Sequence, residues 1–199
     1  MDFNSNTQSG FLDFGYIDTA KYTGALTFVT SVMPNLFTVP VTGYFVKNVL
    51  KPTSFNVIID VGASDSRVPK AVADAYYAQI PGAAYDPKQD IWQYPCKMTA
   101  PFPDFVVQFA SGGKLTWAGA DIKTTTSVDG NVMCWANIRP AASGTNMVWG
   151  KSFIQSVFVV FDYDHNRVGF GRKSTAGSPA GIAPSKPPPP PAPNGSVSN

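Results

Sequence analysis

The chain has 199 residues, with 15 Lys and Arg against 13 Asp and Glu and a formal net charge of +2. A balance this close to neutral gives no electrostatic support for a nucleic-acid partner. No apolar run reaches the length that spans a bilayer, so no membrane partner is expected. The opening "MDFNSNTQSG" has neither a basic nor an apolar region, so it does not predict a secretory signal.

Short runs of β-branched and aromatic residues, separated by Gly, Pro, Asn and Asp, dominate the sequence and predict strands. The runs 106–109 and 115–117 alternate between apolar and polar residues, as half-buried antiparallel strands require. Strands are expected over residues 11–17, 24–31, 36–46, 55–60, 91–94, 105–110, 114–119, 132–138, 146–150, 157–163 and 167–172.

The stretch 68–82 predicts the main helix, because Pro69 suits a first helical turn and an apolar face follows it. The residues that would share this face are Val68, Val72, Ala75 and Tyr76. A second helix of one turn is expected after Gly150, through Phe153 and Ile154. The fold class is therefore mostly β, with one or two short helices.

The two ends of the chain differ in composition from its middle. From about Thr175 the sequence is rich in Ala, Gly, Ser and Pro and ends in "KPPPPPAPNGSVSN", which predicts a disordered tail over residues 175–199. Residues 1–9 are expected to be an unstructured start. The segment 10–174 is long enough for one domain with a core of its own.

The two cysteines, Cys96 and Cys134, stand 38 positions apart, which is not the spacing of a metal site. They are either one disulfide or two buried thiols. The lack of a leader favours thiols, whereas the even count favours a bridge. The single histidine, His165, lies in "DYDHNR" between two predicted strands and is expected in a hairpin turn. No metal site and no cofactor are predicted.

The stretch "VIIDVGASDS", residues 57–66, brings an apolar run directly to a carboxylate, Asp60, and then to a turn containing Gly62. A carboxylate at the end of a buried strand is costly unless it is hydrogen-bonded or serves a function. Asp60 is either a plain acceptor for backbone N–H groups of the turn or a functional group.

The surroundings of Asp60 decide between these alternatives. The segment "IIDVGASDSRVPKAVADAYYAQIPGA" and, about ninety residues later, "NMVWGKSFIQSVFVVFDYDHNRVGFG" resemble the carboxyl-terminal lobe of a fungal pepsin-like aspartic endopeptidase. In that family the motif reads apolar-apolar-Asp-Thr-Gly-Thr, so Asp60 falls on the catalytic aspartate. Val148, Trp149 and Gly150 match the segment that passes beneath the active site. The resemblance covers residues 10–172.

The resemblance implies a single lobe of the pepsin-like double-β-barrel fold and a hydrolase that cleaves peptides or proteins. It also implies a disulfide between Cys96 and Cys134, and secretion. In this family two carboxylates, one from each lobe, share a proton and activate a water without a metal. Because one lobe carries one aspartate, a second lobe or a homodimer is needed for a complete dyad.

The active-site loop departs from the family motif at two positions. Val61 replaces the Thr whose hydroxyl crosses to the opposite lobe, and Ala63 replaces the Thr or Ser that donates to the catalytic carboxylate. Ser64 keeps a hydroxyl one position further on. Since losing a hydrogen bond to a charged group costs about 1.5–3 kcal/mol, the alternative reading is an inactive remnant or a peptide-binding pseudoprotease.

Overall fold

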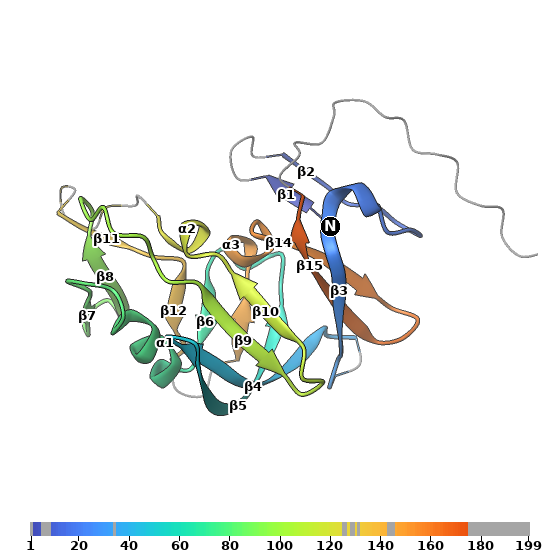
Figure 1. Ribbon diagram of the computed structural model, residues 1–199, viewed down its shortest axis with the longest axis horizontal. Helices are drawn as coiled ribbons and strands as arrows, with labels where there is room; N and C mark the ends of the chain where they lie inside the picture. Colours follow the sequence, from blue (N-terminus) through green and yellow to red (C-terminus); the bar gives the residue numbers. More distant parts are fainter. Residues whose placement is uncertain are drawn as a thin grey trace, which may run out of the picture.

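The computed structural model describes residues 2–4, 9–33, 35–124, 127, 130, 132–142 and 146–174. Strands predominate in this part of the chain (Figure 1), so the mostly β fold class is confirmed and the chain forms a single pepsin-like lobe. The predicted tail, 175–199, lies outside the described residues.

A seven-stranded sheet carries the loop that contains Asp60, and its order is β10-β9-β4-β5-β13-β6-β12. Most neighbours are antiparallel, but β13 runs parallel to β5, and β12 runs parallel to β6. As a result β13 lies between β5 and β6, although it is far from both in the sequence. The strands are β4 (Thr38–Val46), β5 (Val49–Ile59), β6 (Ser66–Val68), β9 (Phe105–Phe109), β10 (Lys114–Trp117), β12 (Ile138–Pro140) and β13 (Met147–Trp149).

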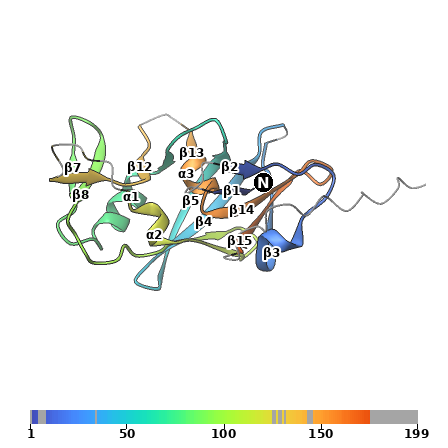
Figure 2. The same ribbon diagram turned by 90° about the horizontal axis from the view of Figure 1, so that it is seen from above.

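Two three-stranded sheets lie at opposite ends of the molecule in Figures 1 and 2. One has the order β11-β8-β7 and the other β14-β15-β3, and a separate hairpin joins β1 to β2. Their strands are β1 (Asp2–Asn4), β2 (Ser9–Phe11), β3 (Tyr22–Thr30), β7 (Ala84–Asp86), β8 (Ile91–Pro95), β11 (Met133–Trp135), β14 (Val157–Asp162) and β15 (Arg167–Lys173).

The helices are short, and both predicted ones are present. The described helices are η1 (Thr19–Lys21), α1 (Lys70–Tyr77), α2 (Gly119–Ile122) and α3 (Lys151–Ile154), and α1 and α3 are the predicted ones. Helix α2 was not predicted. The buried face of α1 consists of Val72, Ala73, Tyr76 and Tyr77, whereas the predicted Ala75 is only half-buried. Among the described helices, none has the length and apolar character needed to cross a membrane.

Two strand predictions and the expected unstructured start differ in detail from the structure. Of the expected strand 11–17 only Phe11 is in a strand, and Gly15 adopts a positive φ of 79° that ends any extended run. The expected strand 132–138 is divided between β11 and β12, because the N–H of Asn137 donates to Ile122 in α2 and leaves the sheet. The start is not unstructured at Asp2–Asn4, which pair with Ser9–Phe11.

The core follows the alternation read from the sequence. On β9 the side chains of Phe105, Val107 and Phe109 are buried, and on the paired β10 those of Leu115 and Trp117 are buried. Aromatic rings then join the central sheet to α3 and β15, since Trp149 packs on Phe153 with ring centroids 4.6 Å apart and Phe109 stacks on Phe170 at 5.4 Å. This packing holds the sheet beneath the Asp60 loop.

Cys96 and Cys134 form a disulfide with their Cα atoms 5.0 Å apart. The bond joins the residue after β8 to the middle of β11, two strands that already pair with each other. The alternative left open by the residues alone is therefore decided in favour of the bridge, as the resemblance implied.

Candidate active site

Asp60 follows the last residue of β5, and the parallel strand β13 places it. The register pairs Trp149 with Ile59, and the N–H of Asp60 donates to the carbonyl of Trp149 at 3.1 Å. The backbone of Asp60 is therefore held by the sheet, while its side chain is exposed. An apolar strand thus delivers a carboxylate to the surface.

The turn after Asp60 supplies one donor to its carboxylate. The N–H of Gly62 donates to Oδ1 of Asp60 at 2.8 Å, and the N–H of Ala63 donates to the Asp60 carbonyl at 3.3 Å. Among the described residues no other group donates to this carboxylate. Val61 is 48% exposed and carries no hydroxyl. Its side chain therefore makes the surface of the loop next to Asp60 apolar.

Gly150 brings a second segment against the Asp60 loop. A Cβ atom at this position would lie 2.3 Å from the carbonyl oxygen of Asp65 and 2.5 Å from that of Ala63, so only glycine fits. The next residue, Lys151, donates its N–H to the Ala63 carbonyl at 2.6 Å. The end of β13 and the turn after β5 are therefore in direct backbone contact.

Two buried serines, Ser66 and Ser152, connect these two segments by hydrogen bonds. The sequence did not predict them. The N–H of Gly150 donates to Oγ of Ser66 at 3.1 Å, and this oxygen lies 3.1 Å from Oγ of Ser152. Ser66 is fully buried and Ser152 nearly so. Isolated serines carry no local sequence signal, since only the position of β13 beside β6 brings them together.

A cluster of one carboxylate and two guanidinium groups lies at the end of the same loop. Nη2 of Arg67 and Nε of Arg139 lie 3.3 Å and 3.4 Å, respectively, from Oδ2 of Asp65. The parallel pairing of β12 with β6 sets Arg139 opposite Arg67. The sequence shows Asp65 and Arg67 as near neighbours, but nothing local points to Arg139.

His165 lies in the turn between β14 and β15, as predicted, and its Nδ1 is 3.0 Å from the Asp162 carboxylate. The hydrogen bond from Arg167 at 2.7 Å, together with that from His165, lowers the pKa of Asp162 to about 2. In the part of the chain that the structure describes, no three His, Cys, Asp or Glu side chains gather as metal ligands. At Asp60, by contrast, an exposed carboxylate accepts from the backbone N–H of Gly62, and such a carboxylate can transfer a proton.

Comparison with known proteins identifies the family. A family model described as eukaryotic aspartyl protease matches residues 1–173. The chain belongs to this family. The Asp60 segment and the Gly150 segment therefore belong to a chain of the aspartyl protease family, which the resemblance indicated.

Named fungal aspartyl proteases are similar to this chain. Aspergillopepsin-1 of Emericella nidulans is 30% identical over 161 residues, which cover 81% of this chain and 39% of the relative. Penicillopepsin-1 of Penicillium janthinellum is 32% identical over 170 residues, covering 82% and 49%. Aspergillopepsin-1 of Aspergillus oryzae is 29% identical over 166 residues, covering 83% and 41%. The chain therefore spans less than half the length of these aspartyl protease relatives.

Proposed function

We propose that this chain supplies one lobe, the carboxyl-terminal one, and one catalytic aspartate, Asp60, to an aspartic-type endopeptidase. The observation that carries the proposal is the exposed carboxylate of Asp60 at the end of β5, fixed through its backbone by Trp149 and through Oδ1 by Gly62. Family membership gives this position its chemical meaning, since the family name is that of a protease.

The proposed chemistry needs a second carboxylate. Two carboxyl groups about 3 Å apart cannot both ionise, so one holds a proton while the other accepts one, as is established for aspartic proteases as a class. The ionised group takes a proton from a water whose oxygen attacks the peptide carbonyl carbon, and the protonated group donates to the carbonyl oxygen. The tetrahedral intermediate then collapses: one carboxyl group passes its proton to the peptide nitrogen, the C–N bond breaks, and the other carboxylate takes the proton from the hydroxyl that becomes the new carbonyl oxygen. In this scheme the N–H of Gly62 orients Oδ1 of Asp60, and no metal or covalent intermediate is required.

The second aspartate comes from a partner lobe, either that of a second copy of this chain or an amino-terminal lobe. A second copy would satisfy the requirement by two-fold symmetry, with one Asp60 from each subunit. The substrate is a peptide or protein chain. The Cys96–Cys134 disulfide supports a secreted, oxidising setting, because such bonds persist there and are rare in the cytosol.

A second candidate is a lobe that binds peptide without cleaving it. Val61 and Ala63 favour this reading, because neither supplies the hydroxyl found in the family motif. Without these hydroxyls, the described donor to the Asp60 carboxylate is the backbone N–H of Gly62. A misoriented catalytic group reduces the rate of reaction steeply.

Hydrolysis of a denatured protein substrate at acid pH distinguishes the two candidates. We expect the wild-type chain to cleave the substrate and Asp60→Asn to abolish cleavage, because the amide can neither accept nor donate the shared proton. Asp164→Asn, an exposed carboxylate in the β14–β15 turn, is the matched control and should retain activity. Equal cleavage by the wild type and Asp60→Asn would remove Asp60 from the mechanism. No cleavage by any form at a concentration at which sedimentation velocity shows a dimer would favour the peptide-binding lobe.

A further inference from the structure

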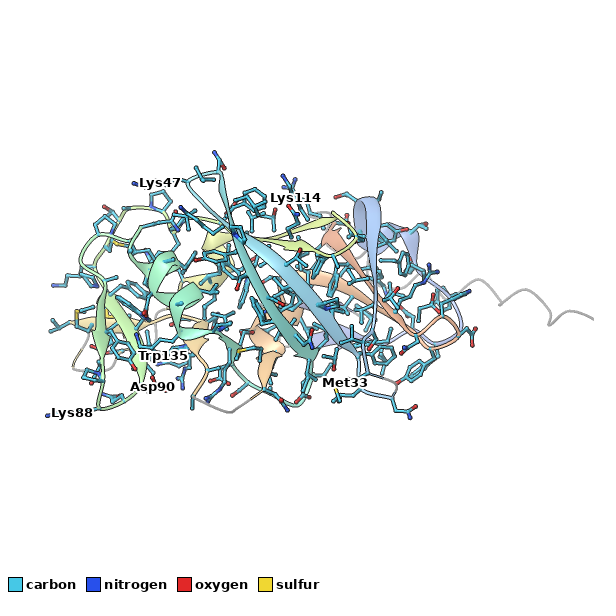
Figure 3. The ribbon with its side chains drawn as sticks, turned by 90° about the horizontal axis from the view of Figure 1, so that it is seen from below. Met33, Lys47, Lys88, Asp90, Lys114 and Trp135 are labelled. Atoms are coloured by element: carbon cyan, nitrogen blue, oxygen red, sulfur yellow. A yellow bond between two sulfur atoms is a disulfide. The ribbon has the colours of Figure 1, made fainter. Side chains whose placement is uncertain are left out.

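A pocket of about 280 Å³ lies beside the end of the Asp60 loop, and no step of the proposed hydrolysis uses it. Its lining combines a cation, an aromatic ring and two polar side chains with one aliphatic residue; the residues are Gln89, Ile91, Ser127, Trp135 and Arg139. They come from the β7–β8 turn, β8, β11, β12 and the segment before β11. Figure 3 shows Trp135 at the end of the molecule built by β7, β8 and β11.

Arg139 is held in this pocket by packing. Its guanidinium carbon lies 4.3 Å from the centre of the Trp135 ring, which is a cation–π contact. Its side chain is 27% exposed, so Arg139 is half-buried at the pocket. The ring of Trp135 thus limits the positions that the guanidinium can take.

Much of the hydrogen-bonding capacity of Arg139 has no partner among the described residues. A guanidinium has five N–H donors and no acceptor. The nearest carboxylate oxygen, Oδ2 of Asp65, is 3.4 Å from Nε but is not aligned for a hydrogen bond, and this Nε is buried without a hydrogen-bond partner among the described residues.

The local charge also favours an anion. Arg67 and Arg139 approach the same oxygen of Asp65, and Arg67 donates to it at 3.3 Å. Two guanidinium groups facing one carboxylate leave an excess of one positive charge. Of these three charged groups, only Arg139 lines the pocket.

We infer that the Arg139 pocket binds the carboxylate of a Glu or Asp side chain in an extended peptide. A planar carboxylate matches the guanidinium fork in two parallel hydrogen bonds, whereas the side-chain amide of Gln89 already donates to Asp86. Asp65 is five residues after Asp60, so the loop cannot separate them by more than about 18 Å. An extended peptide of about six residues reaches from one to the other. This peptide assignment rests on the proposed function, and the pocket would select acidic substrates.

Binding measured by NMR tests the inference without requiring catalysis. Two amidated and acetylated pentapeptides that differ only in a central Glu or Gln are titrated into the ¹⁵N-labelled chain, and the Trp135 indole and Arg139 Nε–H signals are followed. The Glu peptide should bind at least about tenfold more tightly than the Gln peptide, because one charge-assisted hydrogen bond contributes about 1.5–3 kcal/mol. Acetate supplies the carboxylate without a peptide and should bind more weakly than the Glu peptide.

Variants assign the preference to one side chain. Arg139→Gln should remove the difference between the two peptides, Arg139→Lys should keep part of it, and Arg172→Gln, which removes an exposed charge on β15, should leave it unchanged. Equal binding of both peptides to the wild type, or no shift of either signal at millimolar peptide, would overturn the inference even if Arg139→Gln fails to fold. Acetate binding as tight as the Glu peptide would overturn the peptide assignment. None of these results depends on whether Asp60 cleaves a substrate.

Discussion

Asp60 and Asp162 both end an apolar strand, yet the residues around them give the two carboxylates different environments. Asp162 receives hydrogen bonds from Arg167 and His165, whereas the described donor to Asp60 is the backbone N–H of Gly62. A carboxylate that is already paired with a guanidinium, such as Asp162, has a structural role. An exposed one with a single backbone donor remains available to bind a water or to share a proton.

Restoring a hydroxyl at position 63 should increase the catalytic rate. In the family motif this position donates to the catalytic carboxylate, and Ala63 cannot. We expect Ala63→Ser to raise kcat about tenfold with little change in KM, because a hydrogen bond to a charged group contributes about 1.5–3 kcal/mol and orients the carboxylate. Steady-state kinetics on a fluorogenic peptide would measure this. Ala83→Ser, another half-buried alanine, is the matched control, and equal rates for the two variants would contradict the prediction.

The Asp162 carboxylate should make stability depend on pH in the acid range. Its pKa in the folded chain, about 2, lies below the ordinary value of 3.8 because Arg167 and His165 bind the ionised form. Its stabilising contribution is therefore complete above pH 3.8 and is lost as the pH falls towards about 2. Asp162→Asn should be less stable than the wild type at neutral pH, and this difference should shrink across that window.

Urea unfolding at a series of pH values measures this dependence. Asp164→Asn removes a neighbouring carboxylate in the same turn and should keep the wild-type pH dependence. If the difference in unfolding free energy between the wild type and Asp162→Asn stayed constant from neutral pH to pH 2, the ion pair would not be its source.

At the scale of elements, the disulfide supports the small sheet β11-β8-β7, which lines part of the Arg139 pocket. Cys96–Cys134 closes a span of 38 residues, and removing such a bond raises the entropy of the unfolded chain. The double change to alanine should lower the free energy of unfolding by about 3–4 kcal/mol. Amide hydrogen exchange should show the largest loss of protection in β8 and β11, which the bond joins. A loss spread evenly over all sheets would argue against this local role.

Elements with a complete local signal were predicted well. Helix α1 follows Pro69 and buries an apolar face, and β9 and β10 alternate as their sequences indicate. Strands β6 and β7 have three residues each and were missed, because so short a run has no periodicity of its own. The run 132–138 read as one strand, but a hydrogen bond from Asn137 to α2 divides it, and that contact is not encoded locally.

At the scale of the whole molecule, the proposed dyad makes catalysis a property of two lobes. A single chain presents one Asp60, so the rate of cleavage per chain should rise with chain concentration if a second copy supplies the other aspartate, and should fall on dilution as the dimer dissociates. Cleavage assays over a dilution series, combined with sedimentation velocity, measure this. A rate per chain that is independent of concentration would exclude a second copy as the partner.

The sequence by itself determined the strand-rich fold class, the family, and the position of Asp60 after an apolar strand, because each depends on residues that are neighbours along the chain. Only the tertiary structure decided that β13 lies between β5 and β6, that Gly150 contacts the Asp60 loop, and that Arg139 reaches Asp65. These contacts join segments more than seventy residues apart. They depend on strand order and register, which the packing of the complete sheet selects and no local pattern specifies.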